Sequence, residues 1–334
     1  MEDIVTAEEA ARLLKVHPKT IQKWCREGRL QSIRVGNRYR LRKADLRTID
    51  SVSVDTSVKL LPRRNPRPST ERARIVAVTN QKGGVGKTTT TQALGAVLAD
   101  LGQRVLLVDF DPQASLTTSL GIQTTELSKT VYSVMCQFLG DEGAFDTSEA
   151  IVALDSWLAL LPSNINLSAA EVTLPNQVRR EYVLGEILAP IRHEYDWIFI
   201  DCPPSLSLLT INALTCADSC IVPVAPEPLV TVGVGLLFQT VARVRRTKLN
   251  PTLGIDGIVL TKVDARPTLT RGVIDDLRAT LDGRVPILGE IRSSIRVQEA
   301  SASGVPLTRF RAAADAVAAY REIAEVLRAA RRAK

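Results

Sequence analysis

One glycine-rich segment links an apolar run to a helical pattern: Asn80-Gln81-Lys82-Gly83-Gly84-Val85-Gly86-Lys87-Thr88-Thr89. The residues before it, Ile75-Val76-Ala77-Val78, form a short apolar run that favours a buried strand. After it, apolar residues recur at helical spacing from Thr88 to Leu101. A strand, a glycine-rich turn and a helix in this order are the context that a phosphate-binding loop, or P-loop, requires.

The residue types of this segment suit the binding of a nucleoside triphosphate and Mg²⁺. Its glycines allow the backbone to turn so that successive N–H groups point at phosphate oxygens, and the helix N-terminus adds its positive dipole. Lys87 is placed to reach the β- and γ-phosphates, and the Thr88 hydroxyl is placed to ligate Mg²⁺. Gln81 stands where the ordinary pattern has its first glycine, and a second lysine, Lys82, follows it. The expected nucleotide-binding residues are Gly83, Gly84, Val85, Gly86, Lys87, Thr88 and Thr89.

Three aspartates follow two further apolar runs and complete the expected site. The run 105–108 ends in Asp109-Phe110-Asp111, and the run 197–200 ends in Asp201. Continuous apolar runs are typical of parallel strands that are buried on both faces, and ligands of open α/β sheets bind at the carboxyl ends of such strands. We expect Asp109 and Asp201 to support Mg²⁺ together with Thr88. We expect Asp111 to orient the attacking water.

These motifs closely resemble those of the ParA/MinD group of deviant Walker-A ATPases, and within it the ParA partition branch. The resemblance rests on three segments and extends from about Arg74 to near the C-terminus: Lys82-Gly83-Gly84-Val85-Gly86-Lys87-Thr88, Val108-Asp109-Phe110-Asp111-Pro112-Gln113 and Ile200-Asp201-Cys202-Pro203-Pro204. It implies an ATP-dependent homodimer in which Lys82 reaches across to the partner's phosphates, so that Lys82, Lys87 and Asp111 serve catalysis. It also implies a ParB-like centromere-binding partner that stimulates hydrolysis. Relatives usually carry a proline where Arg292 stands, which affects the expected adenine contacts.

The remaining pattern predicts an α/β fold of the P-loop NTPase type, with a doubly wound, mostly parallel sheet. Further strands are expected at 219–224, 257–260 and 287–291, with helices at 232–248 and 270–281. The alanine- and arginine-rich end, 311–334, is expected to form an amphipathic helix packed on the body. Alanine, rather than bulky apolar residues, dominates it, so no membrane partner is expected.

The first fifty residues form a different pattern, that of a winged helix-turn-helix. Thr6-Ala7-Glu8-Glu9 has the form of a capping box before a helix at about 7–15, and Pro18 opens a second helix that stops at Gly28. Two short strands at 31–35 and 38–41 flank Gly36-Asn37, a pair that suits a two-residue hairpin. A short helix is expected from Lys43. The layout resembles excisionase or MerR-like DNA-binding domains, and the expected domains are 1–50, a basic proline-rich linker at 51–73, and the ATPase at 74–334.

Basic residues in both parts predict contacts with DNA. Three polar residues begin the second helix of the small domain, which in such folds enters the major groove, and three arginines lie on the wing, where phosphate or the minor groove is in reach. In the body, the family resemblance implies a surface for sequence-independent DNA binding. Both sets have an alternative reading, as a solvated face of an interaction domain or as partners of a helix dipole. The residues are Lys19, Thr20, Lys23, Arg34, Arg38 and Arg40 in the small domain, and Arg243, Arg245, Arg246, Lys248 and Arg278 in the body.

Composition limits the remaining possibilities. The 334 residues suffice for about two domains, and the formal charge of +7 favours an anionic partner. The start of the chain lacks signal-peptide features, and no long apolar stretch supports a transmembrane helix, so a cytoplasmic protein is expected. The five cysteines are scattered and odd in number, which favours reduced thiols.

The sequence leaves three functions open, all based on ATP. Thr261-Lys262-Val263-Asp264 is similar to the guanine-reading element of GTPases, but its first position is Thr and the Lys82 motif belongs to ATPases. The leading hypothesis is a partition ATPase whose N-terminal domain binds specific DNA for autoregulation. The alternatives are an ATP-switched transcriptional regulator of a mobile element and a positioning ATPase for a protein cargo.

Overall fold

The chain divides into two compact units, Met1–Lys59 and Leu60–Lys334. The computed structural model describes residues 4–6, 9–10, 21, 25, 32–35, 38–42, 72–140, 145–227, 230–264 and 267–332. Residues 51–71 of the expected linker at 51–73 lie outside the described residues, as does the expected helix from Lys43.

The N-terminal unit contains the predicted hairpin and one strand that was not predicted. Strands β2 (Ser32–Val35) and β3 (Arg38–Arg42) pair antiparallel, and the register joins Val35 to Arg38 as a two-residue connection requires. Strand β1 (Ile4–Thr6) pairs with the other edge of β3, giving the order β1-β3-β2. A three-residue strand is too short to show a period of two, so the sequence pattern did not indicate it.

The helix signals of this unit are confirmed where the structure describes them. The Thr6 N–H donates to Glu9 Oε2 at 2.8 Å, and the Glu9 N–H donates to Thr6 Oγ1 at 3.2 Å, which together form the predicted capping box. Glu9, Ala10, Ile21 and Cys25 are helical. Ala10 and Ile21 are fully buried, so both helices turn an apolar side chain inward.

The C-terminal unit is built on an eight-stranded sheet in the order β11-β10-β9-β4-β8-β5-β7-β6. Every neighbouring pair is parallel except β6 and β7. The α/β, mostly parallel fold is therefore confirmed. The strands are β4 (Arg74–Val78), β5 (Val105–Asp109), β6 (Val152–Ala153), β7 (Leu158–Leu161), β8 (Trp197–Asp201), β9 (Ser219–Val224), β10 (Gly254–Val263) and β11 (Ile287–Arg292). Strands β6 and β7 are additions to the predicted set, because their short apolar runs lacked a distinct pattern.

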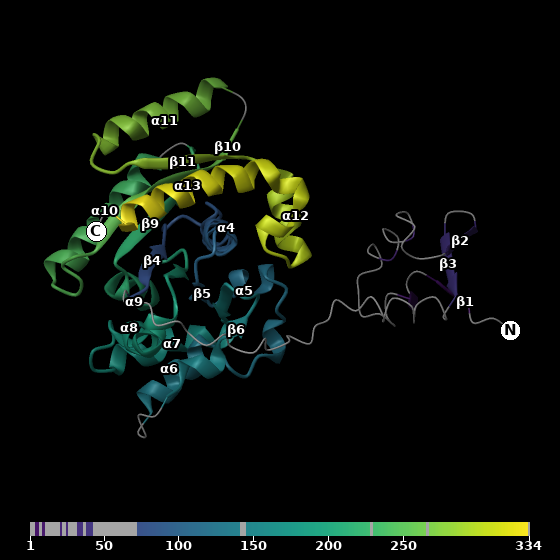
Figure 1. Ribbon diagram of the computed structural model, residues 1–334, viewed down its shortest axis with the longest axis horizontal. Helices are drawn as coiled ribbons and strands as arrows, with labels where there is room; N and C mark the ends of the chain where they lie inside the picture. The colour runs from purple at the N-terminus through teal and green to yellow at the C-terminus, as the bar shows by residue number, and fades with distance from the viewer. Residues whose placement is uncertain are drawn as a thin grey trace. The chain divides into compact units, whose positions relative to one another are not determined.

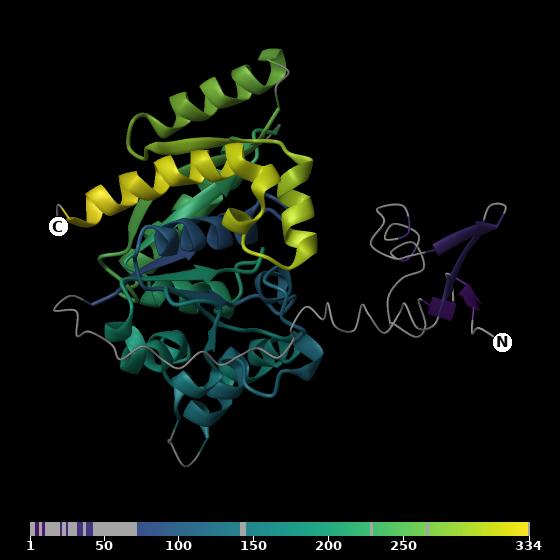
Figure 2. The ribbon, with the colours of Figure 1, turned by 45° about the vertical axis from the view of Figure 1, so that its right-hand side comes forward.

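Helices cover both faces of this sheet (Figures 1 and 2). The long helices α4 and α13 lie together on one face, and α6, α8 and α9 lie on the other, so the predicted C-terminal helix does pack on the body. The helices are α4 (Lys87–Asp100), α5 (Ser115–Ser119), α6 (Val131–Leu139), α7 (Ala170–Thr173), α8 (Val183–Leu188), α9 (Leu208–Cys216), α10 (Val230–Arg246), α11 (Pro267–Leu281), α12 (Ile295–Ser303) and α13 (Ala314–Arg332).

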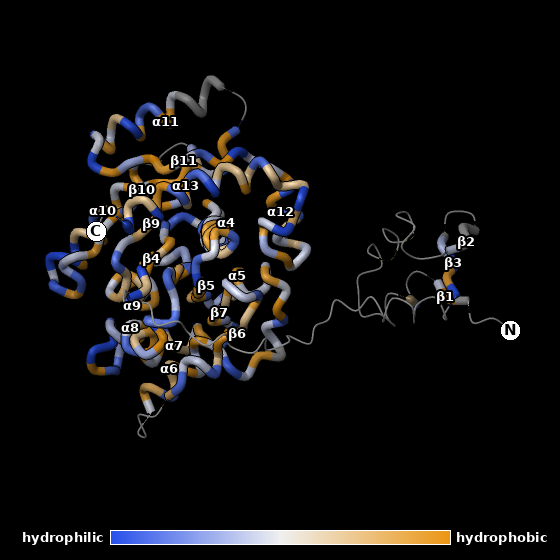
Figure 3. The backbone as a smooth tube through the Cα atoms, viewed as in Figure 1, coloured by the Kyte–Doolittle hydropathy of each residue, from blue (hydrophilic) through white to orange (hydrophobic). Residues whose placement is uncertain are grey.

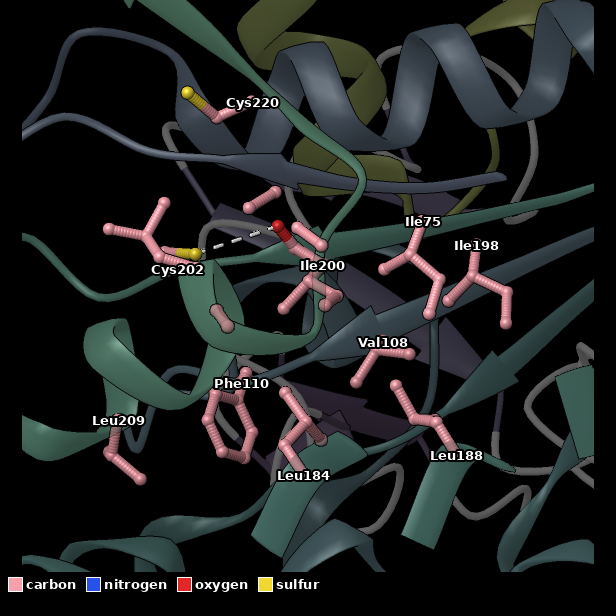
Figure 4. Packing of buried hydrophobic residues seen from close by; sticks show 14 of the residues in the cluster. Ile75, Val108, Phe110, Leu184, Leu188, Ile198, Ile200, Cys202, Leu209 and Cys220 are labelled. Atoms are coloured by element: carbon pink, nitrogen blue, oxygen red, sulfur yellow. Dashed lines mark hydrogen bonds between the residues drawn. The ribbon is translucent and has the colours of Figure 1, made fainter. Parts of the chain in front are cut away.

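Alternate residues of each central strand point into two separate cores. In β4, Ile75 and Ala77 join the core under α8 and α9, whereas Val76 and Val78 join the core under α4 and α13. The apolar colour along the strands in Figure 3 reflects this burial on both faces. Figure 4 shows part of the first core, where Phe110 packs near Leu184 and Leu209. A sheet covered on both faces holds its strand ends rigidly in place.

Close packing between α4 and β5 depends on Gly95. A Cβ at this position would overlap Leu107 Cδ2, and Leu107 is fully buried. We expect Gly95→Ala to destabilise the fold by about 1–3 kcal/mol because the core must shift to admit it. A Cβ at Gly235 in α10 would meet nothing within 4 Å. Gly235→Ala should therefore raise the free energy of unfolding by about 0.5–1 kcal/mol. Urea unfolding of both variants tests this, and equal stability would refute the packing argument.

All five cysteines are free, as expected: Cys202 and Cys220 are buried, Cys25 and Cys216 are partly exposed, and Cys136 is exposed. Burial raises the pKa of Cys220 to about 12, which keeps its thiol protonated. Among the described residues, no helix combines the length and the apolar character needed to cross a membrane.

Candidate nucleotide site

The sheet brings the P-loop and the aspartates to one edge. Strand β8 lies between β4 and β5, although it follows both in the sequence. Its last residue, Asp201, is in register with Val78 at the end of β4 and with Asp109 at the end of β5. The P-loop leaves β4 directly after Val78. The expected convergence of these motifs at the carboxyl ends of parallel strands is therefore present.

The P-loop has the backbone shape and the open space that an anion needs. Gly84 and Gly86 have φ angles of 73° and 85°, a region that favours glycine. A Cβ built at Gly83 or Gly84 would meet nothing within 4 Å, so the loop faces an open cradle. The side-chain amide nitrogen of Gln81 is buried with no acceptor among the described residues. An unpartnered donor beside an open glycine loop fits a phosphate oxygen.

The two lysines of the loop differ in position. Lys87 is 7% exposed, and its Nζ donates to the carbonyl of Lys82 at 3.0 Å, inside its own loop. Burial lowers the pKa of Lys87, and the nearby Asp201 carboxylate opposes that shift. Lys82, in contrast, has a side chain that is 48% exposed. Lys87 is thus placed to serve its own cradle, whereas Lys82 extends to the surface.

Glu227 holds the exposed lysine in the free chain. Lys82 Nζ lies 2.5 Å from Glu227 Oε2, which follows β9 on the neighbouring side of the P-loop. The hydrogen bond from Lys82 lowers the pKa of Glu227. Both side chains are about half exposed, so this ion pair is weak and Lys82 can leave Glu227 for another anionic partner.

Thr88 and Asp201 form the part of the site that suits a divalent cation. The Thr88 hydroxyl donates to Asp201 Oδ2 at 2.7 Å, and the Thr91 hydroxyl lies 3.4 Å from Asp201 Oδ1. Burial raises the pKa of Asp201 well above its ordinary value, and the nearby Asp109 carboxylate adds to the shift. A hydroxyl and a carboxylate are the hard oxygen donors that Mg²⁺ takes. These two residues therefore fit the expected ion.

The raised pKa of Asp201 predicts proton release on binding. Burial favours the protonated form of this carboxyl in the free chain, and a neighbouring cation favours its charged form. Binding of Mg²⁺ and ATP should therefore release protons, up to about one per site, and the number released should rise as the pH falls. Calorimetry in two buffers of different ionisation enthalpy measures that number. Asp201→Asn should remove the release, whereas Asp100→Asn, at an exposed position on α4, should keep it; equal release from both variants would exclude Asp201 as the source.

Asp109 is bonded to its own loop through both oxygens. Its Oδ2 accepts from the Thr117 N–H at 2.8 Å and from the Thr117 hydroxyl at 2.7 Å, and its Oδ1 accepts from the Asp111 N–H at 3.3 Å. Full burial raises the pKa of Asp109 to about 6. These contacts indicate that Asp109 orders the segment from Asp111 to Thr117. We therefore propose that Asp109 supports Mg²⁺ indirectly, by positioning this loop.

Asp111 is held from two sides. Its Oδ1 accepts from the Gln113 N–H at 2.9 Å, and its main-chain carbonyl accepts from the Ser163 hydroxyl at 3.0 Å. Ser163 lies just beyond the end of β7, so this strand helps to position the loop after β5. The side chain of Asp111 is close to the other two aspartates, since its charge contributes to the raised pKa values of both.

The segment that is similar to a GTPase element supports the P-loop instead. Thr261, in β10, is buried, and its hydroxyl donates to the carbonyl of Val85 at 2.7 Å. Its side chain also limits the space beside Gly86. Thr261 therefore has a structural partner in the loop, which accounts for it without a role in reading guanine.

The residues expected to contact DNA have different surroundings. Arg243 and Arg246 in the last turn of α10 are exposed, as is Lys248 after it. Arg245 donates from Nε to the carbonyl of Leu253 at 2.6 Å, and Arg278 pairs with Asp275 and Glu290 at 3.4 Å. These two have structural partners of their own. Lys19, Thr20 and Lys23 lie outside the described residues; Arg34 and Arg38 are in β2 and β3, and Arg40 is half-buried in β3.

Three contributors to the site had no assigned role in the sequence. Glu227 and Ser163 follow β9 and β7, but nothing in their spacing indicated what they contact. Thr117 lies eight residues after Asp109, within a short helix, and gave no signal. The contacts of Glu227 and Ser163 join segments that are distant in the sequence, which only the fold reveals.

Comparison with known proteins agrees with this site. An AAA domain model matches residues 73–255, and a helix-turn-helix domain model matches residues 4–48. The chain is 41% identical to the chromosome partitioning protein ParA of Caulobacter vibrioides, covering 71% of this chain and 87% of that protein. It is also 41% identical to the sporulation initiation inhibitor protein Soj of Bacillus subtilis, covering 71% and 91%.

A solved structure shares the fold of the C-terminal unit. Cobyrinic acid a,c-diamide synthase from Mycobacterium smegmatis, with a bound ATP analog and magnesium, is 38% identical with a TM-score of 0.65. The similarity covers 76% of this chain and 94% of that one. This synthase is named for a different activity from ParA and Soj, so what the three proteins share with this chain is the nucleotide-binding fold. With its P-loop, its strand-end aspartates and these relatives, the chain belongs to the ParA/Soj family of P-loop ATPases.

Proposed function

We propose that the chain is an ATP-dependent DNA partition ATPase that acts as a dimer. The observation that carries the proposal is the division between the two P-loop lysines. Lys87 is buried within its own loop, whereas the Lys82 ammonium reaches the surface, where it is available to a second copy. The name of one 41% identical relative, the chromosome partitioning protein ParA, supports partition as the process. The ADP, ATP analog and magnesium bound by the mycobacterial structures support ATP and Mg²⁺ as cofactors.

In this proposal ATP joins two chains face to face. The glycine loop and Lys87 bind the phosphates of one nucleotide, and Thr88 with Asp201 would hold Mg²⁺. Bound Mg²⁺ supplies neutralisation of the phosphate charge. Lys82 leaves Glu227 and contacts the phosphates held by the partner, so each site is complete only in the dimer. Asp111 orients the attacking water, and hydrolysis then separates the two copies.

Intrinsic turnover is expected to be slow. The charged groups that the contacts above bring to the site are two lysines and four carboxylates. Of these carboxylates, Asp109 is committed to its loop and Glu227 is paired with Lys82. Phosphoryl transfer is fast when an additional cation stabilises the developing charge or when the water is strictly oriented. A ParB-like protein bound at a centromere site is proposed to supply this acceleration.

DNA binding is proposed to be divided between the two units. The helix-turn-helix domain binds a specific operator, which couples expression to nucleotide state. The ATP dimer binds DNA of any sequence through exposed cations such as Arg243, Arg246 and Lys248. Contacts with phosphate alone give salt-dependent binding without sequence preference. This binding would keep the protein on the nucleoid in the cytoplasm.

Removal of residues 1–70 tests the division of labour. With ATP, the shortened protein should bind random duplex DNA as the full chain does but should lose operator recognition, as a mobility-shift titration would show. In the full chain, Arg243→Ala combined with Arg246→Ala should weaken random-sequence binding and reduce the salt slope by about 0.9 for each lost phosphate contact. If ATP never promotes binding to random DNA, a regulator in which ATP only pairs the helix-turn-helix domains is the correct account.

A further inference from the structure

The end of strand β10 carries a lysine in an unusual backbone conformation. Lys262 is exposed and has a φ of 53°, in the left-handed region that residues other than glycine seldom adopt. In the pairing of β10 with β11, Leu260 is opposite Glu290. Val263 is opposite Arg292, so three steps along β10 match two steps along β11. This shift of register is that of a β-bulge, a feature that re-aims a side chain beside many functional sites.

The bulge lies at the nucleotide edge of the sheet, next to the strand end that carries Glu227. Strand β10 is a parallel neighbour of β9, and Leu260 is in register with Val224. Lys262 follows Leu260 by two residues. Glu227 follows Val224 by three residues, on a strand about 4.8 Å away. The side chains of Lys262 and Glu227 therefore start from adjacent strand ends at the same edge.

The P-loop is fixed to both of these strands. Asn80 donates from its side-chain amide to the carbonyl of Pro223 in β9 at 2.7 Å, and its side-chain oxygen accepts from the Lys82 N–H at 3.0 Å. From β10, the Thr261 hydroxyl donates to the Val85 carbonyl. The backbone of Lys82 and the ends of β9 and β10 are thus held in a fixed arrangement.

Lys262 is a second cation for the carboxylate that Lys82 occupies. The hydrogen bond from Lys82 is the main cause of the lowered pKa of Glu227, and the charge of Lys262 adds to that shift. Within the described part of the chain, the Lys262 side chain has no hydrogen bond or ion pair of its own. Its ammonium is therefore available to Glu227 when Lys82 moves.

The movement of Lys82 in the proposed dimer leaves a negative charge without its partner. Once Lys82 contacts the phosphates held by the second chain, Glu227 remains at an interface that already contains the charges of both nucleotides. A carboxylate without a cation in such a closed interface weakens association. An ammonium that replaces Lys82 at this carboxylate removes the penalty, and Lys262 starts from the neighbouring strand end.

We propose that Lys262 is a positioning residue, which takes over the Glu227 carboxylate when Lys82 crosses to the partner's nucleotide. The inference rests on the proposed ATP dimer and specifies how each chain neutralises the carboxylate that Lys82 leaves. The bulge then has a function that offsets its unfavourable backbone conformation, since it directs Lys262 toward the end of β9.

The test is a double-mutant cycle in the full-length protein. Lys262→Met, Glu227→Gln and the variant with both changes are compared with the unchanged chain. Lys262→Arg keeps the charge at the bulge. Arg284→Met is the matched control, because it removes one exposed positive charge before the start of β11, at the opposite edge of the sheet. Light scattering over a dilution series gives the dissociation constant of the ATP dimer, and a fluorescence titration gives the affinity of the single chain for ADP.

Lys262→Met should raise the dissociation constant of the ATP dimer about tenfold, which is about threefold for each of the two pairs that a symmetric dimer loses. Lys262→Arg and Arg284→Met should stay within about twofold of the unchanged chain, the size of a weak surface effect. In the Glu227→Gln background, Lys262→Met should have almost no effect, because no carboxylate remains to be neutralised.

An unchanged dissociation constant in Lys262→Met would overturn the inference. Equal weakening by Lys262→Met in both backgrounds would also overturn it, since Lys262 would then act on a group other than Glu227. A lowered ADP affinity in Lys262→Met would overturn it too, because the lysine would then serve the nucleotide of its own chain. These three results leave the ATP dimer standing. If ATP produces no dimer of the unchanged chain, the proposed function itself fails.

Discussion

Lys82→Ala is expected to abolish ATP-dependent dimerisation while the single chain still binds ATP. Lys82 points to the surface and pairs with Glu227, so its loss leaves the glycine cradle and Lys87 in place. In the dimer, each lysine would contact phosphate in a site closed to water. Loss of one such buried charge contact costs about 2–5 kcal/mol, and a symmetric dimer loses two. The dimer should therefore be undetectable by light scattering at micromolar protein with saturating ATP.

Two matched variants separate this effect from a damaged nucleotide site. Lys87→Ala should lose ATP binding itself, because that lysine lies within the cradle. Glu227→Gln removes the competing partner of Lys82 and should lower the ATP concentration needed for half-maximal dimerisation. Normal dimers of Lys82→Ala would show that the lysine does not act across the interface.

Asp111→Ala is expected to retain ATP dimers but to lose nearly all turnover. The carboxylate lies beside the other two aspartates, yet its own contacts are to Gln113 within the loop, so phosphate binding does not depend on it. Positioned acid–base groups contribute about 10²–10⁴-fold to rate, and a fall of at least about 100-fold is expected. Single-turnover hydrolysis and light scattering on the same sample measure both properties.

Asp109→Asn provides the comparison for this variant. Asp109 accepts from the backbone of Asp111 and from Thr117, and its asparagine retains one acceptor oxygen. It should therefore reduce turnover less than Asp111→Ala does. Turnover close to that of the unchanged protein in Asp111→Ala would remove this residue from the catalytic step.

The central part of the fold could be predicted because its signals are local and strong. The runs at β4, β5 and β8 are continuously apolar, and each stops at a glycine loop or an aspartate. A parallel sheet brings such ends to one edge, so the edge at which the site lies followed from the motifs. The closeness of the three ends depends in addition on β8 lying between β4 and β5. The reciprocal contacts of Thr6 and Glu9 were likewise readable, since a capping box involves residues three apart.

The rest depends on contacts between segments that are distant in the sequence. The pair of Lys82 and Glu227 joins residues 145 apart, and Ser163 lies 52 residues from the carbonyl that it holds. No periodicity encodes such a pair. Strand β6 has two residues and β7 has four, which is too little for a pattern to separate them from a loop. Ala114 has a φ of 51°, which is rare for a residue other than glycine, and it gave no signal either because alanine is ordinary in a helix.

A mixing experiment tests most directly the claim that each chain completes its partner's site. Lys82→Ala and Asp111→Ala are combined with ATP, and the mixed dimers are isolated by two different affinity tags. In a mixed dimer, the site of the Lys82→Ala chain keeps its own Asp111 and receives Lys82 from its partner, so about half of normal turnover should return. Lys87→Ala mixed with Asp111→Ala should stay inactive, since neither site is complete. The account is contradicted if mixed dimers of Lys82→Ala and Asp111→Ala hydrolyse no more ATP than each variant does alone. In that case Lys82 would not act on the nucleotide held by the partner.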